Sequence, residues 1–125
     1  KDSSFKEEMM KIKINELKLF GYHGVYDEEK KNGQEFVIST VVTVSSIPRE
    51  DNISDAIDYS LIIEDIKEVF EAKRYNLIET LALDISNRIL INKRVSSIKV
   101  SVKKEKPPIN ADIDSVAVVY EAIQK

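Results

Sequence analysis

The spacing of apolar residues changes twice along the chain, and this change limits the folds that are open to it. Apolar residues follow strand-like spacing near both ends and helical spacing in the middle, at 11–20, 36–44, 62–70, 78–89, 98–102 and 116–120. Two strands, two helices and two further strands predict an α+β domain of ββααββ order. We expect a four-stranded antiparallel sheet with two antiparallel helices on one of its faces.

The first strand contains a change of side-chain parity. Ile12 and Ile14 occupy one set of alternating positions, whereas Leu17 and Leu19 occupy the other. A strand keeps both pairs on one face only if an extra residue is inserted between them. The sequence therefore predicts a β-bulge near Asn15–Glu16.

Composition excludes several classes of protein. The 125 residues include no cysteine and one histidine, which excludes disulfides, cysteine nucleophiles and a multi-histidine metal site within one chain. We therefore expect no metal and no cofactor. The net charge is −3 and no basic patch stands out, so we expect no nucleic-acid partner. No apolar run approaches the roughly 20 residues that span a bilayer, so we expect a cytoplasmic protein without membrane contact.

One domain accounts for the length and the pattern. We place it at residues 9–125, after a polar extension at residues 1–8 whose origin the sequence leaves open. An open sheet of this kind has two edge strands, which are covered or paired in stable proteins. Pairing with further copies of the same protein would close a barrel, so the pattern permits a ring-like homo-oligomer.

Lys104 is the most informative polar position. It has the same parity as Ile98, Val100 and Val102 and therefore extends the inward row of its strand. An ammonium at the end of an apolar row loses hydration, which favours the neutral amine and suits proton transfer. The alternative is a lysine whose stem packs while its head group extends to water.

Four other polar residues each have a structural alternative to a functional role. Glu79 follows Asn76 by three residues, which predicts a capping box at the start of the second helix. Tyr59, before the first helix, is typical of a half-buried packing residue, and Glu29 lies in a charged run typical of a solvated turn. His23 is a possible general base, but we favour a structural hydrogen-bonding role.

Several segments, in their order and spacing, resemble the dihydroneopterin aldolase family from about Ile12 to Val119. The segments are Phe20-Gly21-Tyr22-His23-Gly24-Val25, Glu28-Glu29, Gly33-Gln34, Asp51-Asn52, Asp58-Tyr59, Asn76-Leu77-Ile78-Glu79 with Leu81-Ala82, and Lys104-Glu105-Lys106-Pro107-Pro108-Ile109. The resemblance implies the tunnelling fold, in which sheets of several subunits join into barrels. It also implies homo-octamers of two stacked tetrameric rings, with sites at subunit interfaces.

The implied reaction is the retro-aldol cleavage of 7,8-dihydroneopterin in folate biosynthesis. The products are 6-hydroxymethyl-7,8-dihydropterin and glycolaldehyde, and neither a metal nor a Schiff base takes part. The ring of this pterin already contains a C=N bond that accepts electrons as a C–C bond of the substrate's side arm breaks. Under this resemblance the protein is an aldehyde-lyase that has only to hold the ring and move protons.

The resemblance also implies roles for single residues. Glu79 would bind the 2-amino and N3 positions of the ring, with backbone contacts from Ile78 and from Ile57 of a neighbouring subunit. Lys104 would lie at the reacting centre with Glu29 and Gln34. Tyr59 would reach the substrate across the interface and act with Lys104 and Glu29 in catalysis. Lys103, Lys106 and Glu28 flank these positions, and spacing favours Lys104 and Glu29.

Two other functions fit parts of the same pattern. A dihydroneopterin triphosphate 2'-epimerase of this fold would use extra cations for the phosphates, and lysines flank Lys104. Epimerisation can also accompany cleavage as a side activity. A non-catalytic pterin-binding module would need Glu79 but not Glu29, Tyr59 and Lys104 together, so their joint presence argues against it.

Overall fold

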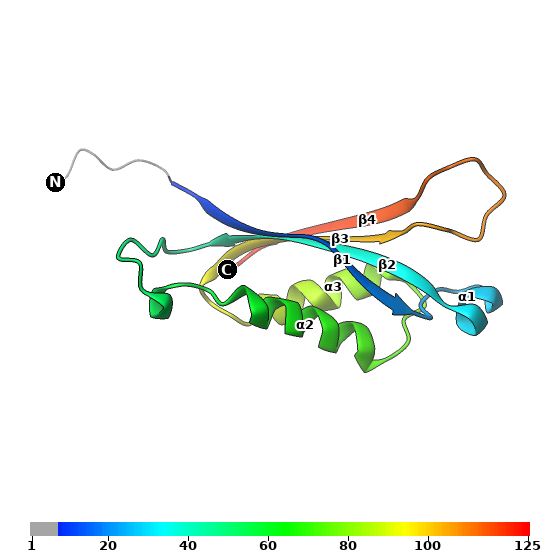
Figure 1. Ribbon diagram of the computed structural model, residues 1–125, viewed down its shortest axis with the longest axis horizontal. Helices are drawn as coiled ribbons and strands as arrows, with labels where there is room; N and C mark the ends of the chain where they lie inside the picture. The colour runs from blue at the N-terminus through cyan, green and yellow to red at the C-terminus, as the bar shows by residue number, and fades with distance from the viewer. Residues whose placement is uncertain (1–7) are drawn as a thin grey trace.

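Four antiparallel strands form one sheet in the computed structural model, which describes residues 8–125 (Figure 1). The strands lie in sequence order, and their bounds are β1 (Met10–Gly21), β2 (Gln34–Val44), β3 (Val95–Lys104) and β4 (Val116–Ile123). Two helices, α2 (Tyr59–Ala72) and α3 (Ile78–Ile89), cover one face of the sheet. The predicted ββααββ order and the one-sided helix layer are therefore confirmed. Most of the predicted extension at residues 1–8 lies outside the described residues.

The bulge predicted in the first strand is confirmed. Ile14 pairs with Thr40, but the next register pair is Leu17 with Ile38, so two residues of β1 have no partner of their own in β2. One of them, Glu16, has a φ of 59°. Because these two residues lie opposite the single residue Ser39, one extra residue is inserted, which keeps both apolar pairs of β1 on the helix-facing side of the sheet.

The apolar stripes of both helices pack on the central strands. Ile66, Leu81 and Ile85 are fully buried, as are Ile38 of β2 and Val100 of β3. Removing each of these residues from water stabilises the fold by roughly 1.5–3 kcal/mol. This core fixes the helix layer on the sheet and so fixes the ends of the elements, where the polar residues lie.

A short helix, α1 (Asp27–Asn32), and a 3₁₀ turn, η1 (Ile53–Asp55), were not predicted. The sequence of α1 contains no apolar stripe, so periodicity gives no signal for it. Its ends nevertheless match a helix dipole, with Asp27, Glu28 and Glu29 in the first turn and Lys30 and Lys31 in the last.

The predicted capping box of the second helix is wrong. The N-cap residue of α3 is Leu77, and its side chain makes no capping hydrogen bond. The amide oxygen of Asn76 instead accepts a hydrogen bond from the guanidinium of Arg74. The Glu79 carboxylate, in the first turn of α3, is therefore not engaged in capping.

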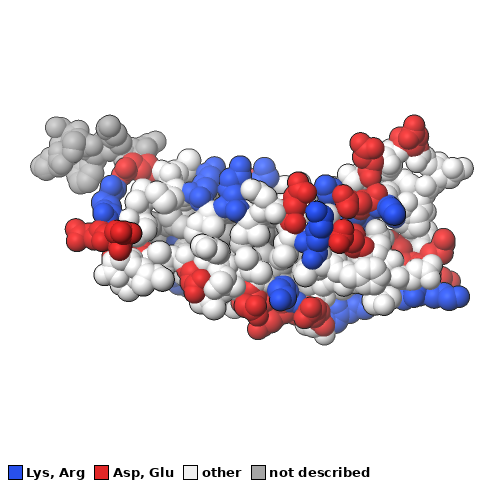
Figure 2. Space-filling view, in the orientation of Figure 1, with Lys and Arg blue, Asp and Glu red and all other residues white. Residues whose placement is uncertain are grey.

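The sheet face away from the helices carries several lysines among polar and apolar residues. Its alternating positions carry Lys11, Lys13 and Lys18 on β1 and Lys99 and Lys103 on β3. Figure 2 shows basic side chains gathered over the middle of this side, and both acidic and basic side chains along the helix layer. Within residues 8–125, no helix combines the length and the apolar character needed to cross a membrane.

Candidate active site

Lys104 is the last residue of β3 and lies on its helix-facing side. Its Nζ is 2.6 Å from Oε2 of Glu29, and the two side chains are 13% and 3% exposed. The ammonium is thus held in the protein by a carboxylate and does not extend to water, so the alternative interpretation of this lysine is wrong. Lys103 lies on the opposite face, with its Nζ 4.0 Å from the Glu105 carboxylate.

Glu29 is buried on α1, contrary to the solvated turn that its charged surroundings suggested. Its Oε1 accepts a hydrogen bond from the Tyr26 backbone N–H at 3.2 Å. Its Oε2 accepts from Lys104 and also from Nε2 of Gln34, at 3.4 Å. The neighbouring Glu28 is exposed, so the structure distinguishes Glu29 from Glu28 as the partner of Lys104.

Gln34, the first residue of β2, completes a cluster of three predicted site residues. Its Nε2 faces Glu29, while its Oε1 is buried and has no hydrogen-bond partner. A buried amide oxygen without a partner is unfavourable unless a ligand or water donates to it. A carboxylate, an ammonium and a free amide oxygen together can exchange protons with a bound molecule and hold one of its N–H or O–H groups.

Gly24 shapes the position of the Glu29 carboxylate. Its φ is +140°, a conformation that L residues with a Cβ rarely adopt. A Cβ at this position would lie 2.0 Å from Oε1 and 2.7 Å from Oε2 of Glu29. The bare backbone of Gly24 is therefore what makes room for the carboxylate beside it.

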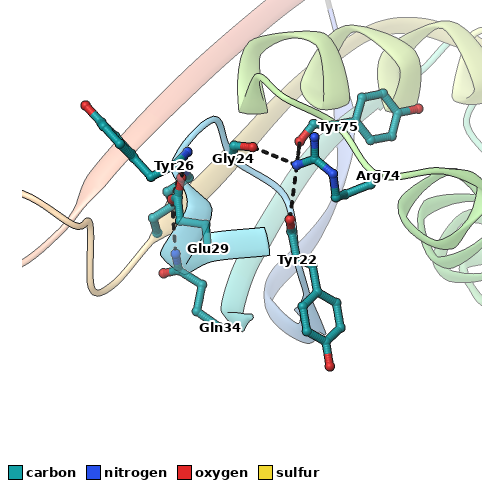
Figure 3. A network of polar contacts seen from close by, with 8 residues as sticks. Tyr22, Gly24, Tyr26, Glu29, Gln34, Arg74 and Tyr75 are labelled. Carbon is teal, nitrogen blue, oxygen red and sulfur yellow. Dashed lines mark hydrogen bonds and ion pairs between the residues drawn. The ribbon is translucent and has the colours of Figure 1, made fainter. Parts of the chain in front are cut away.

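Arg74, which the sequence analysis did not single out, connects this glycine to the loop between α2 and α3. Its Nη1 donates to the carbonyl oxygen of Gly24 at 2.6 Å and, at longer range, to those of Tyr22 and Tyr75, at 3.3 and 3.4 Å (Figure 3). The Gly24 N–H donates to the Tyr75 carbonyl at 2.8 Å. This network could not be predicted from the residue types in the sequence, because most of its acceptors are backbone carbonyls.

His23 is a buried structural residue, as we favoured from the sequence. Its Nδ1 accepts a hydrogen bond from the Tyr75 backbone N–H at 2.9 Å, and its ring meets the Phe70 ring edge to face at 4.5 Å. Burial lowers the pKa of His23 below its ordinary value; the Phe70 backbone opposes this shift and the cations Arg74 and Lys104 add to it. The imidazole is therefore neutral near pH 7, with Nε2 carrying its proton.

Ile78 and Glu79 begin α3 at the same end of the sheet as Lys104. The loop that precedes them is bound to His23 and Gly24, and Figure 1 shows the start of α3 near α1 and the end of β3. Ile78 is buried in the core, whereas Glu79 is exposed. An exposed carboxylate in the first helical turn is free to accept hydrogen bonds from a ligand.

Ile57 and Tyr59 lie at the opposite end of the sheet. The Ala56 carbonyl beside them accepts a hydrogen bond from Arg94, which directly precedes β3, whereas Lys104 ends that strand. Ten strand residues at about 3.3 Å each separate the two ends by roughly 30 Å. One chain therefore does not bring Tyr59, which is 62% exposed, to Lys104.

A surface pocket of about 420 Å³ adjoins the site at the end of the sheet. Its lining comprises Phe20, Gly33, Gln34, Glu35, Glu105 and Lys106. The pocket thus shares Gln34 with the cluster around Glu29 and is also lined by Phe20 of β1. Lys106, considered as an alternative to Lys104, lines this pocket together with two carboxylates.

Comparison with known proteins identifies a family. Residues 12–121 match the family model described as dihydroneopterin aldolase (FolB). A dihydroneopterin aldolase from Staphylococcus epidermidis is 36% identical over 110 residues, which cover 86% of this chain and 91% of the relative. The matched range agrees with the extent of the resemblance seen in the sequence.

Solved structures share the fold. Escherichia coli dihydroneopterin aldolase, in complex with neopterin, has a TM-score of 0.78 and 22% identity, covering 90% of this chain and 98% of the other. Dihydroneopterin aldolase from Burkholderia thailandensis, bound to guanine, has a TM-score of 0.79 and 22% identity, covering 94% and 93%. The predicted tunnelling-fold architecture is thereby confirmed for the single subunit.

Proposed function

The chain belongs to the dihydroneopterin aldolase family, and we infer that it uses the Lys104–Glu29 pair to cleave 7,8-dihydroneopterin. The enzyme is a lyase of folate biosynthesis, and its products are 6-hydroxymethyl-7,8-dihydropterin and glycolaldehyde. The observation that carries the proposed site is the contact of 2.6 Å between Lys104 and the buried Glu29 carboxylate. Groups that exchange a proton at hydrogen-bond distance are suited to general acid–base catalysis.

The reaction needs only proton transfers from the protein. A proton leaves the hydroxyl on the second carbon of the substrate's trihydroxypropyl side chain. The bond between the first and second carbons then breaks, and the second carbon becomes the carbonyl of glycolaldehyde. The electron pair of the broken bond passes to the ring C=N bond, and the carbon left attached to the ring then takes up a proton. We propose that Lys104, Tyr59 and bound water carry these protons, with Glu29 as the partner of Lys104, and that neither metal nor Schiff base is needed.

Glu79 is proposed as the anchor of the pterin ring. Its carboxylate is exposed and not engaged in capping, in the first turn of α3. Two parallel hydrogen bonds from the 2-amino and N3 groups would give a bidentate, charge-assisted contact. The ligand of one structural neighbour, neopterin, carries this pair of N–H donors, and guanine, the ligand of another, carries an equivalent pair at its 2-amino and N1 positions. The backbone of Ile78 adds a polar contact beside the carboxylate.

Tyr59 and Ile57 are proposed to act in the site of a neighbouring subunit. Their distance of roughly 30 Å from Lys104 requires a second copy if they are to contact the same substrate. The edge strands support this assembly, since β4 exposes Val119 and Ile123 and has no neighbour on its outer side within residues 8–125. We propose a homo-octamer of two stacked tetrameric rings, located in the cytoplasm.

An epimerase acting on dihydroneopterin triphosphate is the second candidate. It is favoured by Lys106, which lines the pocket beside Gln34 and offers charge for phosphates, whereas Lys103 lies on the opposite face of the sheet. Glu35 and Glu105 line the same pocket as Lys106, however, and would repel a triphosphate. We therefore favour cleavage of the unphosphorylated pterin, with epimerisation of the substrate as a side activity.

Turnover of two substrates tests this assignment. The purified protein is incubated separately with 7,8-dihydroneopterin and with its triphosphate, and the products are separated by chromatography. Cleavage of the unphosphorylated substrate is the expected result. Epimerisation of the triphosphate without cleavage of dihydroneopterin would identify the enzyme as the epimerase, and tight pterin binding without turnover of either would identify a non-catalytic module.

A further inference from the structure

Arg74 binds together two loops that meet beside the catalytic pair. One loop, residues 22–26, joins β1 to α1, and the other, residues 73–77, joins α2 to α3. The guanidinium of Arg74 in the second loop donates to the Gly24 carbonyl of the first at 2.6 Å. Figure 3 shows it directed at the carbonyls of Tyr22, Gly24 and Tyr75, while the rings of both tyrosines point away. The arginine therefore acts here as a donor to backbone.

Two further hydrogen bonds join the same loops. The Gly24 N–H donates to the Tyr75 carbonyl at 2.8 Å, and the Tyr75 N–H donates to Nδ1 of His23 at 2.9 Å. Gly24 thus has its carbonyl held by Arg74 and its N–H held by Tyr75. With both polar groups fixed, the backbone at Gly24 has little freedom to move.

The position of Gly24 determines where the Glu29 carboxylate can lie. The two are so close that a Cβ on Gly24 would overlap Oε1 of Glu29 at 2.0 Å. The same carboxylate holds the Lys104 ammonium at 2.6 Å. Arg74 thus contacts Gly24, Gly24 lies against Glu29, and Glu29 binds Lys104, so the four residues form a continuous series of contacts.

We propose that Arg74 is a positioning residue for the Lys104–Glu29 pair and acts through the backbone of Gly24. This inference rests on the proposed function of that pair. An arginine suits the task because its planar guanidinium carries five donors, enough to serve several carbonyls and the Asn76 amide oxygen at once. A lysine could serve one or two of them.

Three variants separate positioning from general stabilisation. Arg74→Ala removes the contact, and Arg74→Lys keeps a donor with poorer geometry. Arg88→Ala is the matched control, because Arg88 on α3 also joins α3 to α2, through Glu68 at 2.7 Å, and its hydrogen bond and ion pairs go to α2 and to neither loop. Each variant is characterised by its thermal midpoint, by kcat and KM for 7,8-dihydroneopterin, and by two measurements that need no turnover.

The first of these is the hydrogen exchange of the Gly24 amide, measured by NMR, which reports the opening of the two loops. The second is the rate at which an amine-acylating reagent modifies Lys104, measured by mass spectrometry. In Arg74→Ala we expect faster Gly24 exchange, several-fold faster modification of Lys104, and a fall in kcat of about 10- to 100-fold with a small change in KM. Arg74→Lys should recover part of each effect, and Arg88→Ala should lower only the thermal midpoint.

Unchanged Gly24 exchange and Lys104 modification in Arg74→Ala would overturn the proposal, as would a kcat no lower than that of Arg88→Ala. If the wild-type protein fails to cleave dihydroneopterin, the proposed function is wrong. The exchange and modification rates then still decide whether Arg74 positions the pair, because neither depends on catalysis.

Discussion

Lys104 and Glu29 are 75 residues apart in the sequence, and their side chains meet at 2.6 Å. The lysine ends the row of inward-facing residues on β3, and the glutamate projects from the short helix α1 that follows β1. The pair lies at the end of the sheet where the apolar core gives way to polar groups. Its location gives it limited access to water and, at the same time, access to a bound substrate.

Substitution of Lys104 should mainly lower kcat, whereas substitution of Glu79 should mainly weaken pterin binding. Lys104→Ala removes a proton carrier but leaves the ring anchor, so we expect kcat to fall by roughly 10²–10⁴-fold with pterin affinity largely retained. Glu79→Ala removes two charge-assisted hydrogen bonds and should weaken pterin binding by at least about tenfold. Stopped-flow or equilibrium titration with neopterin measures binding, and initial rates measure turnover. An equal loss of binding in both variants would contradict this division.

The Lys104–Glu29 pair should show strong coupling in a stability cycle. Lys104→Met leaves the Glu29 carboxylate buried without its counter-ion, and Glu29→Gln leaves the ammonium without a carboxylate. Removing one member of a buried ion pair costs roughly 3–5 kcal/mol, whereas replacing both members costs less than the sum. Urea unfolding of the two single variants and the double variant measures this. Additive losses would show that the pair does not interact in solution.

His23 should make stability depend on pH. Burial lowers the pKa of His23 below 6.5, so the unfolded protein takes up a proton at a higher pH than the folded protein. The contribution to stability is present above pH 6.5 and is lost as the pH falls from there through the lowered pKa of the folded state. The sequence has no other histidine, so few other groups titrate in that range.

The thermal midpoint of the wild-type protein should therefore decrease as the pH is lowered from about 7 to about 5. The thermal midpoint of His23→Asn should decrease less over the same interval. Asparagine places an oxygen near the position of Nδ1 and can still accept from the Tyr75 N–H, but it does not titrate. Identical pH profiles for the two proteins would contradict this origin of the pH dependence.

Mixed assemblies should test whether Tyr59 acts across a subunit interface. Tyr59→Phe and Lys104→Ala subunits, each inactive alone, are co-expressed with different tags and purified as mixed oligomers. A site that takes Lys104 from one subunit and Tyr59 from its neighbour is intact in about a quarter of random pairings, so activity should return toward that fraction. Mixed oligomers that stay inactive would place both residues in one subunit's site, and a Tyr59→Phe protein that is active alone would place Tyr59 outside the site.

The main elements of the fold follow from the sequence because their apolar residues are periodic. Even the bulge at Glu16 is visible, since the parity change between Ile14 and Leu17 has no other simple explanation in a strand. Helix α1 is not predictable in this way. It has no apolar stripe, and its one buried residue is the charged Glu29, whose burial depends on Lys104 far along the sequence.

The residues of the site likewise include some that can be predicted from the sequence and some that cannot. Strand parity identifies Lys104, because a lysine in an apolar row is unusual. The capping box at Asn76 and Glu79 was a reasonable local prediction, yet the Asn76 amide binds Arg74 in the folded protein. Contacts of Arg74 with backbone carbonyls cannot be read from residue types, since every residue has a carbonyl.

Cleavage in D₂O tests the central claim most directly. Chelator-treated protein is incubated with 7,8-dihydroneopterin in D₂O, and the pterin product is analysed by mass spectrometry. In the proposed mechanism the carbon left on the ring takes up a proton that the protein draws from solvent, so 6-hydroxymethyl-7,8-dihydropterin should carry one deuterium on its hydroxymethyl carbon. Product without deuterium, or substrate that returns unchanged, would contradict the retro-aldol mechanism assigned to this enzyme.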